Sequence, residues 1–340
     1  MRECGNKWLV TALAAILLLV LFAVNILFGS VDIPLADVCS VLLGESSGKW
    51  DTIIMDVRLP RALTALFAGA AISVAGLILQ TLFNNPLAGP EVLGVNSGAG
   101  LGAAIVILLS QSTVVAGALG VYGFAAILLG AFIGSLFVIA LILMLSSMLR
   151  NRLYLLLAGV ALSYIFSSAI SILNYFATSE GVHSYMIWGM GSFSAVSMEY
   201  MPMFVTIVAL LLLVTVLMMK QLNAILLGDA YAANLGVNVP LVQIVMLAVT
   251  GLLTATVTAF CGPVSFIGLA VPHIARLVLK TSNHHHLLPA SILLGGAVAL
   301  LCNIICLLPG ESGMMPLGAI TPLIGAPVII YVLLRDRKLL

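Results

Sequence analysis

Two groups of residues in the chain have the types and spacing that could bind a metal. His284, His285 and His286 are consecutive imidazoles, and imidazole is the commonest metal ligand in proteins. Cys302 and Cys306 lie one helical turn apart, as a ligand pair would. However, adjacent helix positions point in different directions, and no acid or cysteine accompanies the histidines. The cysteines are more simply explained as small apolar residues in a packed helix, so we expect no metal site.

A third segment, GESSGKW at 44–50, has the glycines and the lysine of a phosphate-binding loop. Three residues rather than four separate the glycines, and Trp50 stands where the motif needs Ser or Thr. The apolar segments of the chain also carry no acid in their middle, which a proton- or sodium-coupled carrier generally needs. A transporter with this sequence would therefore take its energy from a partner subunit. The absence of HExxH and of paired acids within apolar segments disfavours a membrane enzyme.

The composition is that of a membrane protein with several spans. Of 340 residues, 62% are hydrophobic and 7% are charged, whereas globular proteins have about a quarter charged. A helix needs about 20 apolar residues to cross the hydrocarbon core of a bilayer. We therefore predict an all-α, polytopic fold, one transmembrane domain over 1–340, with ten spans near 8–28, 62–84, 92–110, 114–147, 153–177, 200–219, 240–260, 263–280, 287–308 and 317–334.

The basic residues predict the orientation of these spans, because loops retained in the cytoplasm carry an excess of Lys and Arg. An inside N-terminus leaves one long segment outside, at 29–61, and places both termini in the cytoplasm. The net charge of +1 gives no argument for nucleic acid. The outside then has three basic residues (Lys49, Arg58, Arg61) and the inside has ten (Arg2, Lys7, Arg150, Arg152, Lys220, Arg276, Lys280, Arg335, Arg337, Lys338).

The segment 58–102 joins two of the spans through a short turn with few charges. Its first span is rich in Gly and Ala, which let helix backbones approach closely in lipid. Asn85 and Pro86 stop that helix, and Gly262-Pro263 break a later apolar segment in a similar way. Broken helices of this kind line pathways in transporters, and the two breaks fit an inverted repeat of spans 2–5 and 7–10.

Several of these segments, taken in order, resemble FecCD-type permeases, the membrane subunits of vitamin B12 and iron-siderophore ABC importers. The resemblance covers nearly the whole chain. It is carried by RLPRALTALFAGAAISVAGLILQTLFNNPLAGPEVLGVNSGA (58–99), LLLAGVALS (155–163), LGDAYAANLGV (227–237), GPVSFIGLAVPHIARLV (262–278), HLLPASILLGGA (286–297) and LIGAPVIIYVLL (323–334).

This resemblance implies a transport subunit rather than an enzyme, in a type II ABC importer of the cell inner membrane. The cargo would be a metal chelate such as an iron siderophore, haem or cobalamin. Two copies of the chain would form a homodimer with two ATPase subunits, which bind ATP and Mg, and with one periplasmic or lipid-anchored binding protein. The chain itself would hold no cofactor. An ion-coupled secondary transporter is the alternative.

The resemblance also implies roles for residues at the outer mouth and in the broken turn. Arg58 and Arg61 would receive acidic residues of the binding protein, unless they only anchor the helix end in the headgroups. In the broken turn Asn85 and Leu87 would narrow the translocation path on its inner side, unless Asn85 merely caps a helix. The turn between the fourth and fifth spans, around Asn151 and Arg152, would close the path from the other side.

The segment 220–239 interrupts two apolar spans with short, glycine-punctuated stretches, which predict two short helices bent at glycines. An ordinary cytoplasmic linker is the other interpretation. By resemblance, this segment would seat in a cleft of the ATPase. The residues that match the family there are Gly228, Asp229, Ala232, Leu235, Gly236 and Val237.

The chain departs from the family pattern at three positions near its outer end. An Asp and an Arg usually stand near the end of the ninth span, with an acid shortly before the next proline. Here Asn303, Leu307 and Met314 occupy these places. His273, by contrast, fits the pattern, and we expect it to make a local hydrogen bond at a span end.

Overall fold

The structure, a computed structural model, describes residues 2–29, 31–44, 48, 50–109, 121–149, 151–310 and 313–336. In these ranges every regular element is a helix. The elements are α1 (Arg2–Leu27), α2 (Leu35–Leu42), a π-helical turn (Ile53–Arg58), α3 (Leu59–Leu82), a 3-10 turn (Pro90–Leu93), α4 (Val95–Leu109), α5 (Val121–Met148), α6 (Arg152–Phe176), α7 (Ser179–Gly189), a 3-10 turn (Phe193–Ala195), α8 (Met201–Leu217), α9 (Met219–Leu226), α10 (Asp229–Asn234), α11 (Val239–Cys261), α12 (Ile267–Leu279), α13 (His284–Cys306) and α14 (Leu317–Asp336).

The predicted all-α membrane fold is confirmed, and each predicted span contains one long apolar helix or one shorter one. Among the described residues, six helices are long and apolar enough to cross a membrane, or seven if α8 and α9, which meet at a 54° bend, count as one span. The shorter apolar helices are Val95–Leu108, Ile267–Leu279 and Leu317–Val332. The long segment 114–147 holds α5, and its first residues lie outside the described ranges.

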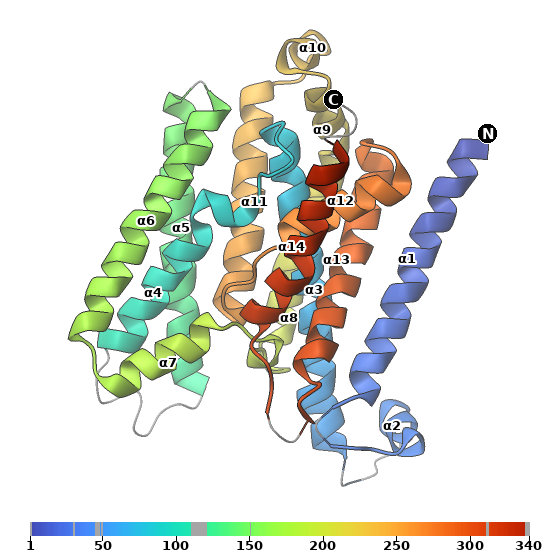
Figure 1. The fold of residues 1–340 in the computed structure, drawn as a ribbon, viewed down its shortest axis with the longest axis vertical. Helices are drawn as coiled ribbons and strands as arrows, with labels where there is room; N and C mark the ends of the chain where they lie inside the picture. The colour runs from blue at the N-terminus through green and yellow to red at the C-terminus, as the bar shows by residue number, and fades with distance from the viewer. Residues whose placement is uncertain are drawn as a thin grey trace.

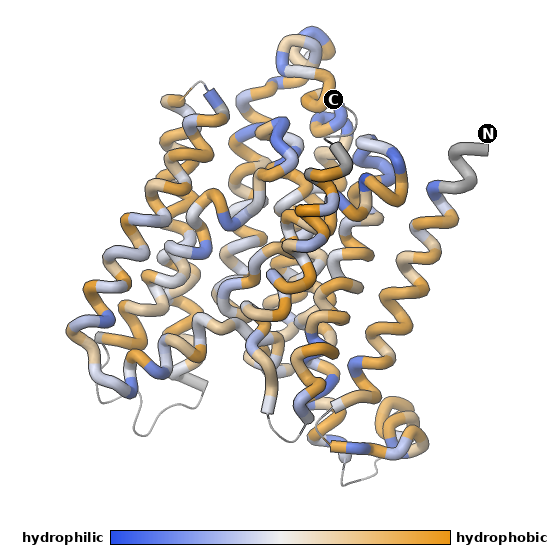
Figure 2. The backbone as a smooth tube through the Cα atoms, viewed as in Figure 1, coloured by the Kyte–Doolittle hydropathy of each residue, from blue (hydrophilic) through white to orange (hydrophobic). Residues whose placement is uncertain are grey.

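α3 is the central helix of the bundle. It is buried along almost its whole length and packs against α11, α12 and α13, whereas α1 lies at one edge and α6 at the other (Figure 1). The helices at the two edges are apolar along most of their length (Figure 2). Large apolar side chains on them, such as Leu13 on α1 and Ile165 on α6, are exposed, as on helices that face lipid.

Glycines bring α3 unusually close to its neighbours. A Cβ added at Gly69 would collide with the carbonyl oxygen of Gly295 on α13, and one at Gly76 with that of Gly268 on α12. α4 and α5 meet in the same way, because Gly98 faces the backbone of Gly134. In lipid, where apolar burial does not drive association, such close van der Waals packing holds helices together.

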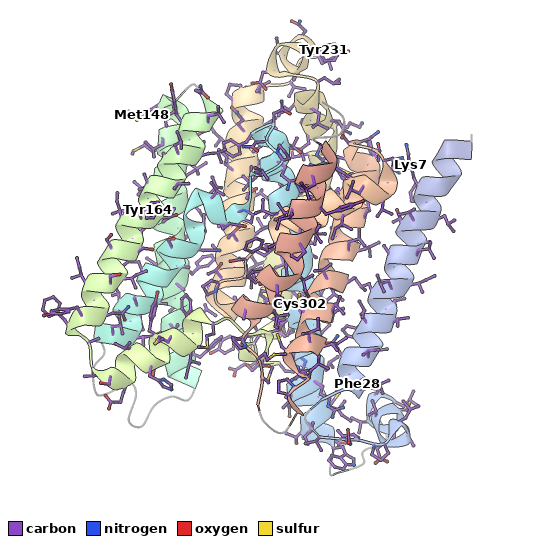
Figure 3. All side chains as sticks on the ribbon, in the orientation of Figure 1. Lys7, Phe28, Met148, Tyr164, Tyr231 and Cys302 are labelled. Atoms are coloured by element: carbon purple, nitrogen blue, oxygen red, sulfur yellow. The ribbon has the colours of Figure 1, made fainter. Side chains whose placement is uncertain are left out.

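The chain termini distinguish the two ends of the bundle. Both termini lie at one end, together with α9, α10 and the turn before α13 (Figure 1), and we call it the inner end after the predicted orientation. Lys7 and the exposed Tyr231 lie there, whereas Phe28 lies at the opposite, outer end (Figure 3). The predicted outer segment 29–61 contains α2 and then enters the helix that runs from Ile53 to Leu82.

Candidate functional site

The turn between α3 and α4, residues 83–94, is the candidate gate. Asn84 has a left-handed backbone, with φ 44°, and Asn85 donates its backbone N–H to the Gln80 carbonyl at 3.2 Å. The Asn85 Oδ1 accepts the Leu87 backbone N–H at 2.9 Å. Asn85 therefore caps the backbone of the turn itself and not the start of a helix, since the next α-helix begins at Val95, and its role in the gate stays a prediction. Leu87 is 45% exposed, so an apolar side chain is available at the surface of this turn.

α12 supports the gate turn through two polar side chains. The His273 Nε2 lies 2.7 Å from the Pro86 carbonyl oxygen, which can only accept, so this nitrogen carries a proton. This is the local hydrogen bond expected for His273. Arg276 donates to the Gln80 Oε1, and the Gln80 Nε2 donates to the Leu269 carbonyl at 3.3 Å. The last turn of α3 and the gate turn are thus tied to one short helix.

A polar cavity of about 300 Å³ opens beside this turn. Sequence reasoning counted Arg276 only as an inner basic residue and missed that its guanidinium reaches this wall. In the sequence, only the position of Arg276 one helical turn after His273 indicated that both side chains could lie at the same site. The cavity is lined by Gln80, Asn84, Asn85, Pro86, Leu226, His273, Arg276, Leu277, Ser282 and Val332.

The turn between α5 and α6 was predicted to close the path from the other side. Asn151 caps α6, because its Oδ1 accepts the Leu153 backbone N–H at 2.9 Å. The side chain of Arg152 lies outside what the structure describes. α6 does pack against the gate turn, but further along the helix, where Gly159 meets the backbone of Val92 and Leu93. The role of Asn151 and Arg152 in closure stays a prediction.

The predicted coupling segment forms two short helices, α9 and α10, bent at glycines. Gly228 has φ 106° and Gly236 has φ 82°, in the left-handed region that L side chains rarely adopt. Ala232 is fully buried, and Leu235 is 59% exposed at the tip. The Val237 backbone N–H returns to the Ala232 carbonyl at 3.0 Å, which closes the end of α10. Asp229 opens α10 in its first turn, where an acid is favourable.

Arg58 and Arg61, the predicted docking residues, lie at the outer end of α3 but are buried. Arg58 is 2% exposed and Arg61 is 5% exposed. The Arg58 Nη1 donates to the carbonyls of Ile26, at 2.9 Å, and Leu27, at 2.7 Å. Its Nη2 donates to the carbonyl of Val31. Arg58 thus ties the C-terminal end of α1 to α3, and contact with a binding protein would require both side chains to reorient.

Two of the positions that depart from the family pattern lie at an outer cavity of about 170 Å³. Asn303 and Met314 line it, together with Met190, Met315 and Cys306. The Asn303 Nδ2 also donates to the Asn25 Oδ1 at 2.6 Å, which joins α13 to α1. Asn303 therefore has a packing role that a charged residue could not fill without a partner.

The described residues contain no group of three or more His, Cys, Asp or Glu placed to hold a metal. His284 is buried in a hydrogen-bond network, and the His286 ring packs edge-on against Trp8 with centroids 5.8 Å apart. Cys302 and Cys306 are buried free thiols. Lys49 of the GESSGKW segment lies outside the described residues.

Comparison with known proteins gives a consistent result over nearly the whole chain. The model of the FecCD transport family matches residues 17–335. The vitamin B12 import system permease protein BtuC of Escherichia coli O9:H4 (strain HS) is 35% identical over 317 residues, which cover 91% of this chain and 94% of that protein. BtuC of Klebsiella pneumoniae is 36% identical over 291 residues, 86% of this chain and 85% of that protein. A solved metal-chelate type ABC transporter in an inward-facing conformation superposes with a TM-score of 0.82 at 27% identity, covering 96% of this chain and 98% of that one.

Proposed function

Because the chain belongs to the FecCD transport family, we propose that it is the permease subunit of an ABC importer for a metal chelate, with cobalamin as the first cargo to test. The observation that carries the proposal is the match to vitamin B12 import permeases over 91% of the chain, together with the fold shared with a metal-chelate transporter. Iron siderophores and haem are the other chelates in this proposal. Membership of a family of transport subunits agrees with a chain that is not an enzyme.

The energy for transport would come from ATPase subunits, one bound to each of two permeases. The α9–α10 segment stands out from the inner end and is the natural contact for them (Figure 1). Tyr231 and Leu235 are exposed on it, and tyrosine is one of the residues that contribute most to binding at protein interfaces. This location also supports the proposed orientation, with both termini in the cytoplasm.

The pathway would run between two copies of the chain and be closed near its inner end by the gate turn. Asn85 and Leu87 from both copies would meet there, with Asn151 and Arg152 closing the other side. The turn is suited to this task because His273 and Arg276 hold it from α12, and a small movement of that helix would displace it. A wide path closed by a turn needs no tight cargo pocket in the permease.

At the outer end, a soluble or lipid-anchored binding protein would deliver the cargo. Its acids would meet Arg61 and Arg58 once both side chains have reoriented, Arg58 after its release from the α1 carbonyls. Surface ion pairs are each worth about 0.2–1 kcal/mol, so these contacts would orient the binding protein rather than hold it tightly.

Uptake into proteoliposomes tests the proposal. The permease is reconstituted with and without a partner ATPase subunit, and the vesicles receive binding protein loaded with cobalamin, a ferric siderophore or haem. We expect uptake of one chelate only when the ATPase is present and ATP is supplied on its side of the membrane, opposite to the binding protein. Uptake that proceeds without the ATPase and collapses with an ionophore would favour the ion-coupled alternative.

A further inference from the structure

His284 is buried at the start of α13 and touches two other helices at the inner end. Its side chain has no exposed surface, although it is the first of three consecutive histidines in the first turn of α13. The Nδ1 lies 2.8 Å from the Asn223 Oδ1 on α9, and the Nε2 lies 3.0 Å from the Thr81 Oγ1 on α3. One imidazole therefore bridges the helix that leads into the coupling segment and the helix that leads into the gate turn.

The surrounding hydrogen bonds determine which nitrogen of the His284 ring carries a proton. The Asn223 Oδ1 also accepts the backbone N–H of His284 at 2.9 Å, and the Asn223 Nδ2 donates to the Asn283 Oδ1 at 3.0 Å. These contacts orient the Asn223 amide so that its Oδ1 accepts from His284, and the His284 Nδ1 therefore carries a proton. The Nε2 faces the Thr81 hydroxyl, whose single hydrogen serves either the Nε2 or the Leu77 carbonyl 2.9 Å away.

On the α3 side, the bridge reaches the base of the gate turn. Thr81 is in the last turn of α3, and its carbonyl accepts the Asn84 backbone N–H at 3.3 Å. The preceding residue, Gln80, accepts the Asn85 backbone N–H. A displacement of the Thr81 side chain would therefore be felt by the two asparagines of the turn.

On the α9 side, the bridge reaches the coupling segment. Asn223 stands five positions before Gly228, on the short helix α9 whose next element is α10. The end of α9 also approaches the gate, since Leu226 lines the same cavity as Asn84 and Asn85. α10 packs against α9, so a movement of α10 would press on α9 and displace Asn223.

We propose that His284 is a positioning residue that transmits movement of the ATPase-docking segment to the gate turn, through Asn223 on one side and Thr81 on the other. The inference rests on the proposed function as an ABC importer permease. Apolar contacts between α9 and α3 could slide past one another, whereas two directed hydrogen bonds to opposite nitrogens of a rigid ring resist sliding. Their strength is enhanced in a buried, low-dielectric site.

The test compares uptake per ATP hydrolysed in the reconstituted importer. The variants are Thr81→Val, which removes only the hydroxyl from a side chain of the same shape, and His284→Leu, which removes both bonds. His285→Ala is the matched control, because His285 is the exposed neighbour in the same turn. We expect uptake per ATP to fall about threefold to tenfold in Thr81→Val, the factor that one hydrogen bond confers, to fall further in His284→Leu, and to stay unchanged in the control.

A second readout separates transmission from simple structural support. A cysteine placed at Asn85 in both copies should change its disulfide crosslinking on ATP addition in the parent and lose that response in Thr81→Val, with the unfolding temperature unaltered. The proposal is overturned if Thr81→Val keeps the parental uptake per ATP, or if uptake and ATP hydrolysis fall in proportion. A parent that shows no ATP-driven uptake would instead reject the proposed function.

Discussion

Replacing Arg58 with Met should destabilise the isolated permease, because the guanidinium satisfies carbonyls at the end of α1. The bond to Ile26 is buried, whereas those to Leu27 and Val31 are partly buried and can be replaced by water. A lost hydrogen bond to a charged group costs about 1.5–3 kcal/mol, and each hydrated carbonyl about 0.5 kcal/mol. The total is about 2.5–4 kcal/mol. At about 2 °C per kcal/mol, the unfolding midpoint should fall by roughly 5–8 °C.

The buried cysteines supply the assay. Cys261, Cys302 and Cys306 are buried and Cys39 is exposed, so a thiol-reactive fluorophore added to protein in detergent reports unfolding in a background that carries both Cys4→Ser and Cys39→Ser. Heating at one fixed scan rate is needed, since membrane proteins often unfold irreversibly. Arg58→Lys should lie between parent and Arg58→Met, because an ammonium lacks the planar fork that serves several carbonyls at once.

A second variant checks the same contact from the other side. A Cβ added at Gly29 would lie 2.9 Å from the Nε and the Nη2 of Arg58, so Gly29→Val should shift the guanidinium and lower the midpoint as well. An unchanged midpoint in Arg58→Met, combined with slower association of the binding protein, would refute the anchoring role and leave docking as the function of this arginine.

Three further outcomes follow from the proposed sites. Cysteines at Asn85 in both copies should crosslink in the resting dimer and block uptake, and cysteines that stay apart in every nucleotide state would place the gate elsewhere. Gly236→Val should uncouple ATP hydrolysis from uptake, because a β-branched residue cannot keep φ 82°, and normal transport by an assembled variant would contradict this. Arg61→Glu should slow association of the binding protein and flatten its salt dependence, with basal ATP hydrolysis as the control and an unchanged rate as the contrary result.

The spans and their breaks could be predicted because their signals are local. Apolar length marks each helix, and proline and glycine mark where α3 and α11 stop. The bends of the coupling segment at Gly228 and Gly236 are local in the same sense, since left-handed backbone needs glycine there. Whether these sites gate, dock or couple depends on other chains, so those roles stay predictions.

The functions of individual polar side chains could not be predicted, because their partners are distant in the sequence. Arg58 meets carbonyls 27 to 32 positions earlier, and charge counting could only place it outside. His284 meets Thr81, 203 positions away, and the run of three histidines gives no local sign that this ring would be buried. His284 is buried because α9 and α3 pack against the start of α13. The hydrophobic periodicity of the sequence does not reveal this packing.

The gate turn is the covalent link between two closely packed groups of helices. α3 meets α12 and α13 through Gly76 and Gly69, while α4 meets α5 through Gly98. Backbones in such contact cannot slide without collision, so each group moves as a unit. A relative movement of the two groups must therefore be absorbed by residues 83–94. The 2.7 Å bond from His273 holds the Pro86 carbonyl to α12, so the first part of the turn stays with α12 and the change concentrates after it. That places the moving end of the gate near Leu87, the exposed apolar residue of the turn.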